Sequence, residues 1–305
     1  MNGMASDITV VITCFNQAST IRQSVESACA QTYAPALVIV VDDASDDIAT
    51  KETLSAVEKK PAVEVITRLS NGGVSAARNT GLSRVTTPFV VMLDGDDLLE
   101  PDYIEATRAE LMADEQIFAA SSWMKTFGIL NATVKPTGGN MLPFLCRNCA
   151  PATCMFCVSA LRQSGGYDES MQKGFEDWDC CLSLFETFGA DNLQSRVSIV
   201  QKPLIRYRTA PASSNIVSMN SRLDLLRYLI GKHRDLYSKH LEDAILGFEK
   251  TSIDRLALFE ATVKNNPQII ENCDAATSFM DSPTFGDGGM AAAVRIESKI
   301  ARENH

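Results

Sequence analysis

Histidine is scarce in this chain of 305 residues: it occurs three times, and no histidine precedes His233. The residue type that most often serves as a general base is therefore missing from most of the chain, which disfavours a Ser-His-Asp hydrolase. Proton transfer in the N-terminal part must then use carboxylates, Lys, Tyr or Cys. The 38 acidic residues make carboxylates the first candidates.

An excess of positive charge and long apolar runs are also missing. The formal net charge is -10, which disfavours nucleic acid as a partner because a basic surface supplies most of that affinity. Apolar runs such as residues 89–93 are too short to cross a bilayer, and the first residues lack the apolar stretch of a secretory signal. We therefore expect a globular, cytoplasmic protein.

Two common nucleotide-binding signatures are absent. Residues 71–81 (NGGVSAARNTG) form a Gly-rich turn into a helical segment, but they contain neither G-x-G-x-x-G nor G-x-x-x-x-G-K. This disfavours a nicotinamide-dependent dehydrogenase and a P-loop nucleotidase.

The nine cysteines include two closely spaced pairs, Cys146 with Cys149 and Cys154 with Cys157. Two C-x-x-C pairs resemble half of a zinc site, but zinc sites usually place a dozen or more residues between the pairs. Residues 152–158 also have the pattern of a buried strand, on which positions i and i+3 point to opposite faces. Buried thiols are the expected interpretation, and a metal site remains the alternative.

The chain alternates apolar strands and helical segments over its first hundred residues, which predicts an α/β fold with a mostly parallel sheet. The predicted strands are residues 8–13, 37–41, 63–67, 89–93 and 118–127. From residue 219 the strand signals stop and helical spacing takes over. We expect a catalytic domain over residues 1–218 and a helical extension over residues 219–305.

Acidic residues follow the predicted second and fourth strands, at residues 42–47 and 94–97. Asp94 and Asp96 are two apart in extended chain, so both carboxylates can reach one hard cation, Mn²⁺ or Mg²⁺. Helix capping is the alternative and could explain Asp46 or Asp47, or Ser75 at a later helix. Capping explains the crowding less well, because like charges repel unless a cation lies among them.

A second acidic cluster, Glu176-Asp177-Trp178-Asp179, begins a helical segment. These acids could simply complement the helix dipole. The sequence also fits a carboxylate base beside an aromatic platform on which a sugar stacks, and position alone leaves the two interpretations equal.

With these residues in view, residues 7–215 resemble the family 2 glycosyltransferases of the GT-A fold. The motifs that carry the resemblance are residues 10–16 (VVITCFN), 40–47 (VVDDASDD), 71–82 (NGGVSAARNTGL), 92–97 (MLDGDD) with 101–102 (PD), 165–169 (GGYDE), 174–179 (GFEDWD) and 203–208 (PLIRYR). The resemblance implies a metal-dependent, inverting transfer of a hexose or N-acetylhexosamine from a nucleotide-diphosphate sugar, such as a UDP-sugar. The acceptor would be a saccharide or a lipid-linked molecule.

The resemblance also implies roles for individual residues. Asp177 would be the general base, Asp96 would bind the metal together with Asp94, and Glu176 and Trp178 would shape the acceptor site. The remaining residues would bind the nucleotide sugar: Thr13, Phe15, Asp43, Asn71, Arg78 and Asp94.

One departure concerns the segment after Arg208, where many members have a His near the position of Ala210. This leaves open a catalytically silent nucleotide-sugar-binding or scaffold protein. A nucleotidyltransferase is a third alternative, but the basic Gly-rich signature expected near the first strand is absent. The helical extension could pack on the domain, form a homo-oligomer or touch the inner membrane face. Contact with the membrane is suggested by a group of basic residues, although an ordinary solvated helix face explains them too. These residues are Arg222, Arg227, Lys232 and Arg234.

Overall fold

The computed structural model describes residues 6–188, 193–209, 218, 221–283 and 288–303. The chain folds as two compact units, residues 1–240 and residues 241–305. The first unit thus extends past residue 218, the expected end of the catalytic domain, and includes part of the expected helical extension over residues 219–305. Helices α9 (Arg222–Lys232) and α10 (Arg234–Lys239) belong to it, and they bury Leu229 and Leu236.

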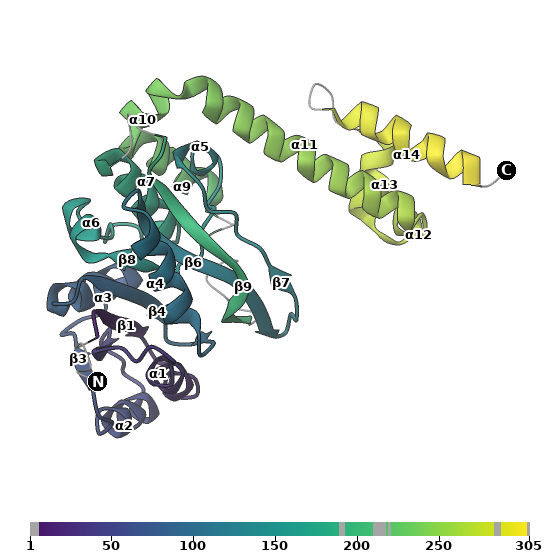
Figure 1. Ribbon diagram of the computed structural model, residues 1–305. Coiled ribbons are helices and arrows are strands. Elements are labelled where there is room, and N and C mark those ends of the chain that lie inside the picture. The colour runs from purple at the N-terminus through teal and green to yellow at the C-terminus, as the bar shows by residue number, and fades with distance from the viewer. Residues whose placement is uncertain (1–5, 189–192, 210–217, 219–220, 284–287, 304–305) are drawn as a thin grey trace. The chain divides into compact units, whose positions relative to one another are not determined.

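The first unit is built on the expected alternation of strands and helices, and the expected α/β class is confirmed. Its first half contains β1 (Ile8–Cys14), α1 (Ile21–Cys29), β2 (Leu37–Asp42), α2 (Ile48–Val57), β3 (Val63–Thr67), α3 (Gly73–Arg84), β4 (Phe89–Asp94), β5 (Leu98–Leu99) and α4 (Tyr103–Ala113) (Figure 1). Each of the four strands predicted here is present. Strands β1, β2 and β4 are continuous runs of β-branched and apolar residues before any terminal Asp, as expected where both faces of a parallel sheet are covered.

The second half of the unit adds short antiparallel pairings and one long parallel pair. It contains β6 (Ile117–Gly128), β7 (Thr133–Val134), α5 (Met141–Phe144), β8 (Met155–Cys157), α6 (Val158–Gln163), α7 (Glu176–Phe188) and β9 (Arg196–Thr209). The strand expected over residues 118–127 is present as β6. The strand expected over residues 152–158 is present as the shorter β8. The sequence did not predict a strand over the residues of β9.

The strands form one sheet in the order β3-β2-β1-β4-β8-β6-β9-β5, with β7 paired to β6. Strands β3, β2, β1 and β4 are parallel, and their order reverses between β1 and β4. Such a reversal leaves a crevice beyond the carboxyl ends of the strands, where ligands of open α/β sheets bind.

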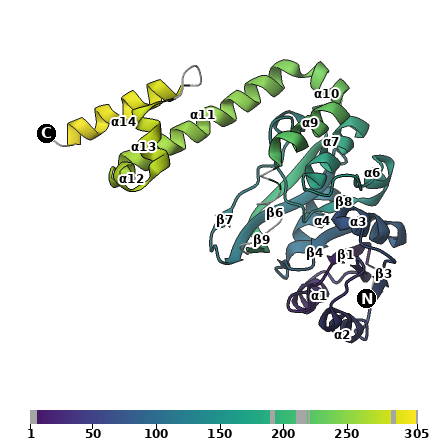
Figure 2. The same cartoon turned by 180° about the vertical axis from the view of Figure 1, so that it is seen from behind.

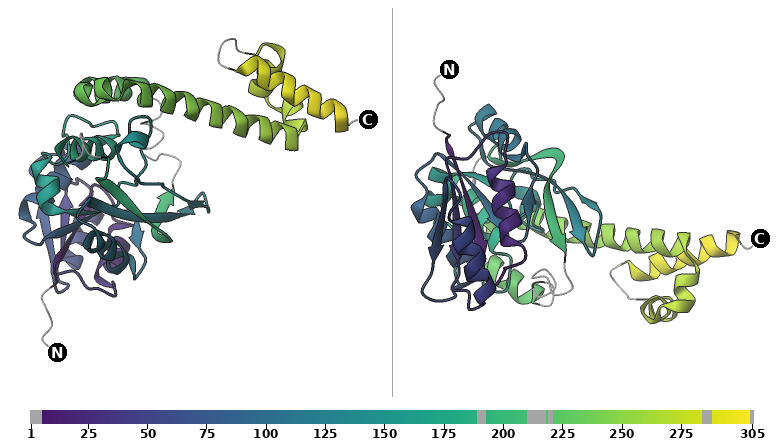
Figure 3. Two further views of the ribbon diagram at one scale, coloured as in Figure 1. Left: turned by 45° about the horizontal axis from the view of Figure 1, so that its top comes forward. Right: turned by 90° about the horizontal axis from the view of Figure 1, so that it is seen from below.

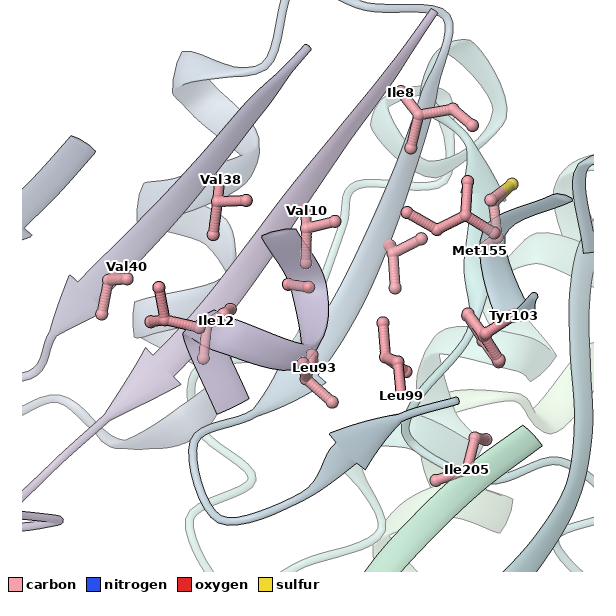
Figure 4. Packing of buried hydrophobic residues seen from close by; sticks show 14 of the residues in the cluster. Ile8, Val10, Ile12, Val38, Val40, Leu93, Leu99, Tyr103, Met155 and Ile205 are labelled. Carbon is pink, nitrogen blue, oxygen red and sulfur yellow. The ribbon is translucent and has the colours of Figure 1, made fainter. Parts of the chain in front are cut away.

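Both faces of β1, β2 and β4 are mostly buried, whereas the edge strand β3 is largely half-buried. On one face, Val10 and Val40 pack in a core that includes residues of α1 and α2, such as Val25 and Leu54 (Figure 4). Helices α1 and α2 lie side by side there (Figure 3). On the opposite face α3 packs against β1 so closely that a Cβ on Gly81 would lie 2.3 Å from Val11 Cγ1. Gly81 therefore sets the distance between α3 and the sheet.

The second unit is entirely helical where it is described. It consists of α11 (Leu241–Asn265), α12 (Gln268–Asn272), α13 (Asp274–Asp281) and α14 (Gly289–Glu303). Glu260 on α11 forms an ion pair with Arg295 on α14, and the rings of Phe259 and Phe279 meet edge to face with centroids 5.0 Å apart. No helix within the described ranges has the length and apolar character needed to span a membrane.

Candidate active site

The carboxyl ends of β1 and β4 bring two of the predicted site residues together. Thr13 and Asp94 are register partners, and the Thr13 hydroxyl donates to Asp94 Oδ1 over 3.4 Å. Beyond β1, Phe15 is 45% exposed, which leaves its ring available for contact with a planar ligand. These residues lie where the strand order reverses, between β1 and β4.

Asp43, at the end of β2, is held by donors from the next strand and helix. Its carboxylate accepts the N–H groups of Gly72 and Gly73 and forms an ion pair with Arg68. Asp43 is 3% exposed, so it fastens the start of α3 to the end of β2. Asn71, just before this start, is exposed beside it.

Asp47 caps α2, because its carboxylate accepts the N–H groups of Ala49 and Thr50. Helix capping therefore explains Asp47, one of the acidic residues within residues 42–47. It does not hold for Ser75, which lies inside α3.

Arg78 is a buried cation that joins the two acidic clusters. It is 2% exposed; its Nη2 donates to Asp94 Oδ1 over 2.8 Å and its Nη1 to Glu176 Oε1 over 2.9 Å. Its guanidinium lies over the Tyr167 ring, 5.1 Å from the centroid. Burial opposes the charge of Arg78, but Asp94 and Glu176 outweigh it and raise the pKa of Arg78. The two clusters, far apart in sequence, are thus parts of one site.

The Asp94-Gly95-Asp96 turn approaches β1 closely. A Cβ on Gly95 would lie 2.4 Å from the carbonyl oxygen of Thr13, so no larger residue fits without displacing the turn. Burial, and then the charge of Asp94, raise the pKa of Asp96 to about 6.

The donor set of this turn fits a divalent cation. Asp94 Oδ2 and the Asp96 carboxylate accept no hydrogen bond from another described residue. Two partly buried carboxylates without donors are favourable ligands for Mn²⁺ or Mg²⁺. The described residues contain no group of three or more His, Cys, Asp or Glu that could hold a metal, so further ligands would have to come from elsewhere.

Asp177, the predicted base, is the second residue of α7 and has a donor on each carboxylate oxygen. The Trp178 N–H donates to Oδ1 over 2.8 Å, and the Asn148 side-chain amide donates to Oδ2 over 2.8 Å. Burial, followed by the charge of Glu176, raises the pKa of Asp177 to about 7, although Arg78 and these donors act in the opposite direction. A carboxyl group with such a pKa can take a proton near neutral pH.

The idea that Trp178 offers a sugar-stacking platform is wrong in this structure. Trp178 is 1% exposed, its indole N–H donates to the carbonyl oxygen of Phe144 over 2.6 Å, and its ring packs on Phe175. The hydrogen-bonded indole is a core residue that fixes the start of α7. Glu176 is likewise buried and forms an ion pair with Arg78.

The cysteine pairs of residues 146–157 lie in the segment that supplies Asn148. Cys146, Cys149 and Cys154 are buried thiols, each directed at a backbone carbonyl oxygen, and all nine cysteines of the chain are free. Asn148 is the residue of this segment that sequence reasoning missed. The feature of the sequence that could have indicated it is that Asn148 is the one amide side chain within the cysteine-rich residues 146–157.

A buried network, also not predicted from the sequence, connects the end of α9 to α7. His233 is 1% exposed; its Nε2 lies 3.0 Å from Asp179 Oδ1 and its Nδ1 lies 2.8 Å from Glu186 Oε2. Lys232 Nζ donates to Asp179 and to Asp168. Burial lowers the pKa of His233, but its two carboxylate partners raise it by more.

Three of the four basic residues that suggested membrane contact interact with other side chains of the protein. Lys232 forms ion pairs with Asp168 and Asp179, Arg227 forms an ion pair with Asp224, and Arg222 lies over the Phe175 ring. Ala210, near the expected position of the family's His, lies outside the described residues.

Known proteins resemble this chain in sequence and in fold. A sequence model of the family described as "Glycosyl transferase family 2" matches residues 9–164. Among curated relatives, the succinoglycan biosynthesis protein ExoO of Rhizobium meliloti is 38% identical over 96 residues, which is 32% of this chain and 27% of that protein. The pre-mycofactocin glycosyltransferase of Mycobacterium tuberculosis is 31% identical over 192 residues, 59% of this chain and 39% of that protein. The chain therefore spans well under half the length of these two relatives.

Among solved structures, that of S. aureus TarS 1-349 in complex with UDP-GlcNAc is similar with a TM-score of 0.59. The sequence identity is 16%, and the similarity covers 97% of this chain and 92% of that one. At this identity the likeness concerns the fold.

Proposed function

The chain belongs to glycosyl transferase family 2 and has its GT-A fold, and we propose that it transfers a hexose or N-acetylhexosamine from a UDP-sugar to a saccharide or lipid-linked acceptor. The structural similarity to S. aureus TarS, which was solved in complex with UDP-GlcNAc, supports the choice of a UDP-sugar as the donor. The observation that carries the proposal is the Arg78 bridge. It connects Asp94, beside the diphosphate position, to Glu176, the neighbour of the proposed base.

The donor half of the site lies at the ends of β1, β2 and β4. We assign the nucleoside to the exposed ring of Phe15, to Thr13 and to the Asn71 turn, which Asp43 holds in place. Asp94 and Asp96 would hold Mn²⁺ or Mg²⁺, which supplies the positive charge that stabilises the leaving diphosphate.

The acceptor half lies at the start of α7. Asp177 removes the proton of the acceptor hydroxyl as its oxygen attacks the anomeric carbon on the face opposite the diphosphate. One displacement inverts that carbon, and no glycosyl-enzyme intermediate is required. Asn148 and the Trp178 N–H hold the carboxylate in one orientation, which favours attack by a correctly placed hydroxyl.

The test is Asp177→Asn, compared with wild type in two measurements. We expect UDP binding in the presence of Mn²⁺ to stay unchanged, and UDP release from a UDP-sugar in the presence of acceptor to fall by about a thousandfold. Full turnover in the variant would remove Asp177 from the mechanism. Binding of UDP by wild type with no transfer to any acceptor would favour the silent alternative.

A further inference from the structure

Strands β6, β7 and β9 form a positively charged ribbon in an acidic protein. The chain has a formal charge of -10, yet no Asp or Glu occurs between Glu115 and Asp168 or between Asp191 and Asp224. All three strands lie within these two stretches, and β6 pairs with β9 along its length. Figures 1 and 2 show the three strands extending together. The charge of this ribbon is therefore not balanced by carboxylates of its own strands.

One face of the ribbon alternates cations with aromatic rings. In the parallel pair, Lys125 is opposite Arg206 and Phe127 is opposite Arg208, and partners in a parallel ladder point to the same side. Trp123 shares this side because it precedes Lys125 by two positions. We call this set, with Lys135 of the β7 side, the ribbon face: Trp123, Lys125, Phe127, Lys135, Arg206 and Arg208.

The cations of the ribbon face lie against its rings. Lys135 Nζ is 4.6 Å from the centroid of the Trp123 ring. The guanidinium carbons of Arg206 and Arg208 are 5.0 Å and 4.5 Å from the centroid of Phe127.

The outer cations of this face are available to a ligand. Lys125, Lys135 and Arg206 are exposed, and none of them takes part in an ion pair within the described ranges. Trp123 and Phe127 are half-buried, so part of each ring reaches solvent.

The ribbon face adjoins the catalytic edge. Arg208 Nε donates to the carbonyl oxygen of Asp96 over 2.9 Å, and the Arg208 N–H donates to Asp97 Oδ1 over 2.8 Å. A chain lying along the face would therefore come close to the Asp94-Gly95-Asp96 turn, where the donor sugar is activated under the proposed function.

We propose that the ribbon face binds the acceptor, and that this acceptor is a saccharide chain carrying carboxylate or phosphate groups. Lys and Arg side chains recognise both kinds of anion. The rings between them offer apolar area to the sugar units. The inference rests on the proposed function, because it places an acceptor beside the donor site. A nucleic acid is favoured less, because the face adjoins the proposed donor site, where a glycosyltransferase binds its acceptor.

Tryptophan fluorescence gives a direct test, because the chain has two tryptophans and Trp178 is 1% exposed. Quenching by a saccharide therefore reports on Trp123. The probes are oligogalacturonate and its methyl ester, which share one sugar backbone but differ in charge. We expect quenching by the acid at low salt, weakening as salt rises, and at least about tenfold weaker binding of the ester. Equal affinity for the two probes would overturn the proposal.

Variants locate the binding. Lys125→Ala with Arg206→Ala should weaken oligogalacturonate binding by about tenfold, the size expected for two exposed ion pairs. The control is Lys51→Ala with Lys59→Ala, which removes the same charge from exposed positions in α2 and in the turn that follows it. An equal loss in both double variants would contradict a site on the ribbon.

Two further measurements separate the remaining outcomes. Inorganic polyphosphate should compete with oligogalacturonate, because the face recognises either anion. Tighter binding of single-stranded oligothymidylate, or of vesicles of anionic phospholipid, would overturn the saccharide assignment. UDP binding with Mn²⁺ should be the same in wild type and both double variants. A wild type that fails to bind UDP would refute the proposed function, whatever the ribbon binds.

Discussion

The side-chain amide of Asn148 donates a hydrogen bond of 2.8 Å to Oδ2 of Asp177. This bond joins the cysteine-rich segment to the first turn of α7. Because an N–H donor stabilises the charged carboxylate, Asn148 lowers the pKa of Asp177 against the effects of burial and of Glu176.

Asn148→Ala should move the pH dependence of transfer. Wild-type transfer should rise with pH through about 7, where Asp177 loses its proton. Without the amide the charged form is less favourable, so the midpoint moves to higher pH and kcat at neutral pH falls by about tenfold. The measurement is kcat and kcat/KM against pH. Asn131→Ala, at an exposed position after β6, is the matched control, and identical midpoints in wild type and Asn148→Ala would contradict this role.

Asp96→Asn should separate donor binding from its dependence on metal. Removal of divalent ions by a chelator should stop transfer by the wild type, and Mn²⁺ should restore it. In the variant, added Mn²⁺ should no longer increase UDP affinity, and transfer should fall by at least about a hundredfold because charge on the leaving diphosphate is not stabilised. Calorimetric titration of UDP with and without Mn²⁺ measures this. An unchanged response to Mn²⁺ would exclude Asp96 as a ligand.

Gly95→Ala should damage the same site without changing any charge. The added Cβ would lie 2.4 Å from the Thr13 carbonyl oxygen, so the Asp94–Asp96 turn must shift away from β1. We expect UDP affinity with Mn²⁺ to fall by about tenfold and the free energy of unfolding by about 1–3 kcal/mol. Gly231→Ala is the control, since nothing lies within 4 Å of a Cβ there. Wild-type affinity in Gly95→Ala would show that the turn tolerates the displacement.

His233 should make the stability of the protein depend on pH. Its pKa in the folded state is raised by Asp179 and Glu186 despite burial, so its contribution is complete below the unfolded pKa of about 6.5. The contribution is lost as the pH rises through the higher folded value. His233→Gln should therefore cost about 3 kcal/mol at about pH 6 and less at about pH 9, in urea unfolding.

The control for this change is His240→Gln, at the junction of α10 and α11. A cost of His233→Gln that does not vary with pH would show that the pKa of His233 is the same in the folded and unfolded protein, and would contradict this prediction.

The positions of the strands and of the donor-side carboxylates follow from local sequence. Strands β1 and β4 are uninterrupted apolar runs, and polar residues start where the runs end. Because parallel strands end at one edge of a sheet, polar residues that follow different strands are expected at the same edge, and the structure places Thr13 beside Asp94 there. The family motifs then assigned a role to each of them.

The tertiary structure decided how the acceptor side is built. Arg78 reaches Glu176 across 98 positions of the chain, Asn148 reaches Asp177 across 29, and His233 reaches Asp179 across 54. No local periodicity encodes such pairs. The burial of Trp178 was likewise invisible, because an aromatic residue among acids fits a core position and an exposed platform equally well. Local sequence fixes where a strand ends, whereas the partner of a buried charge depends on which distant segments pack around it.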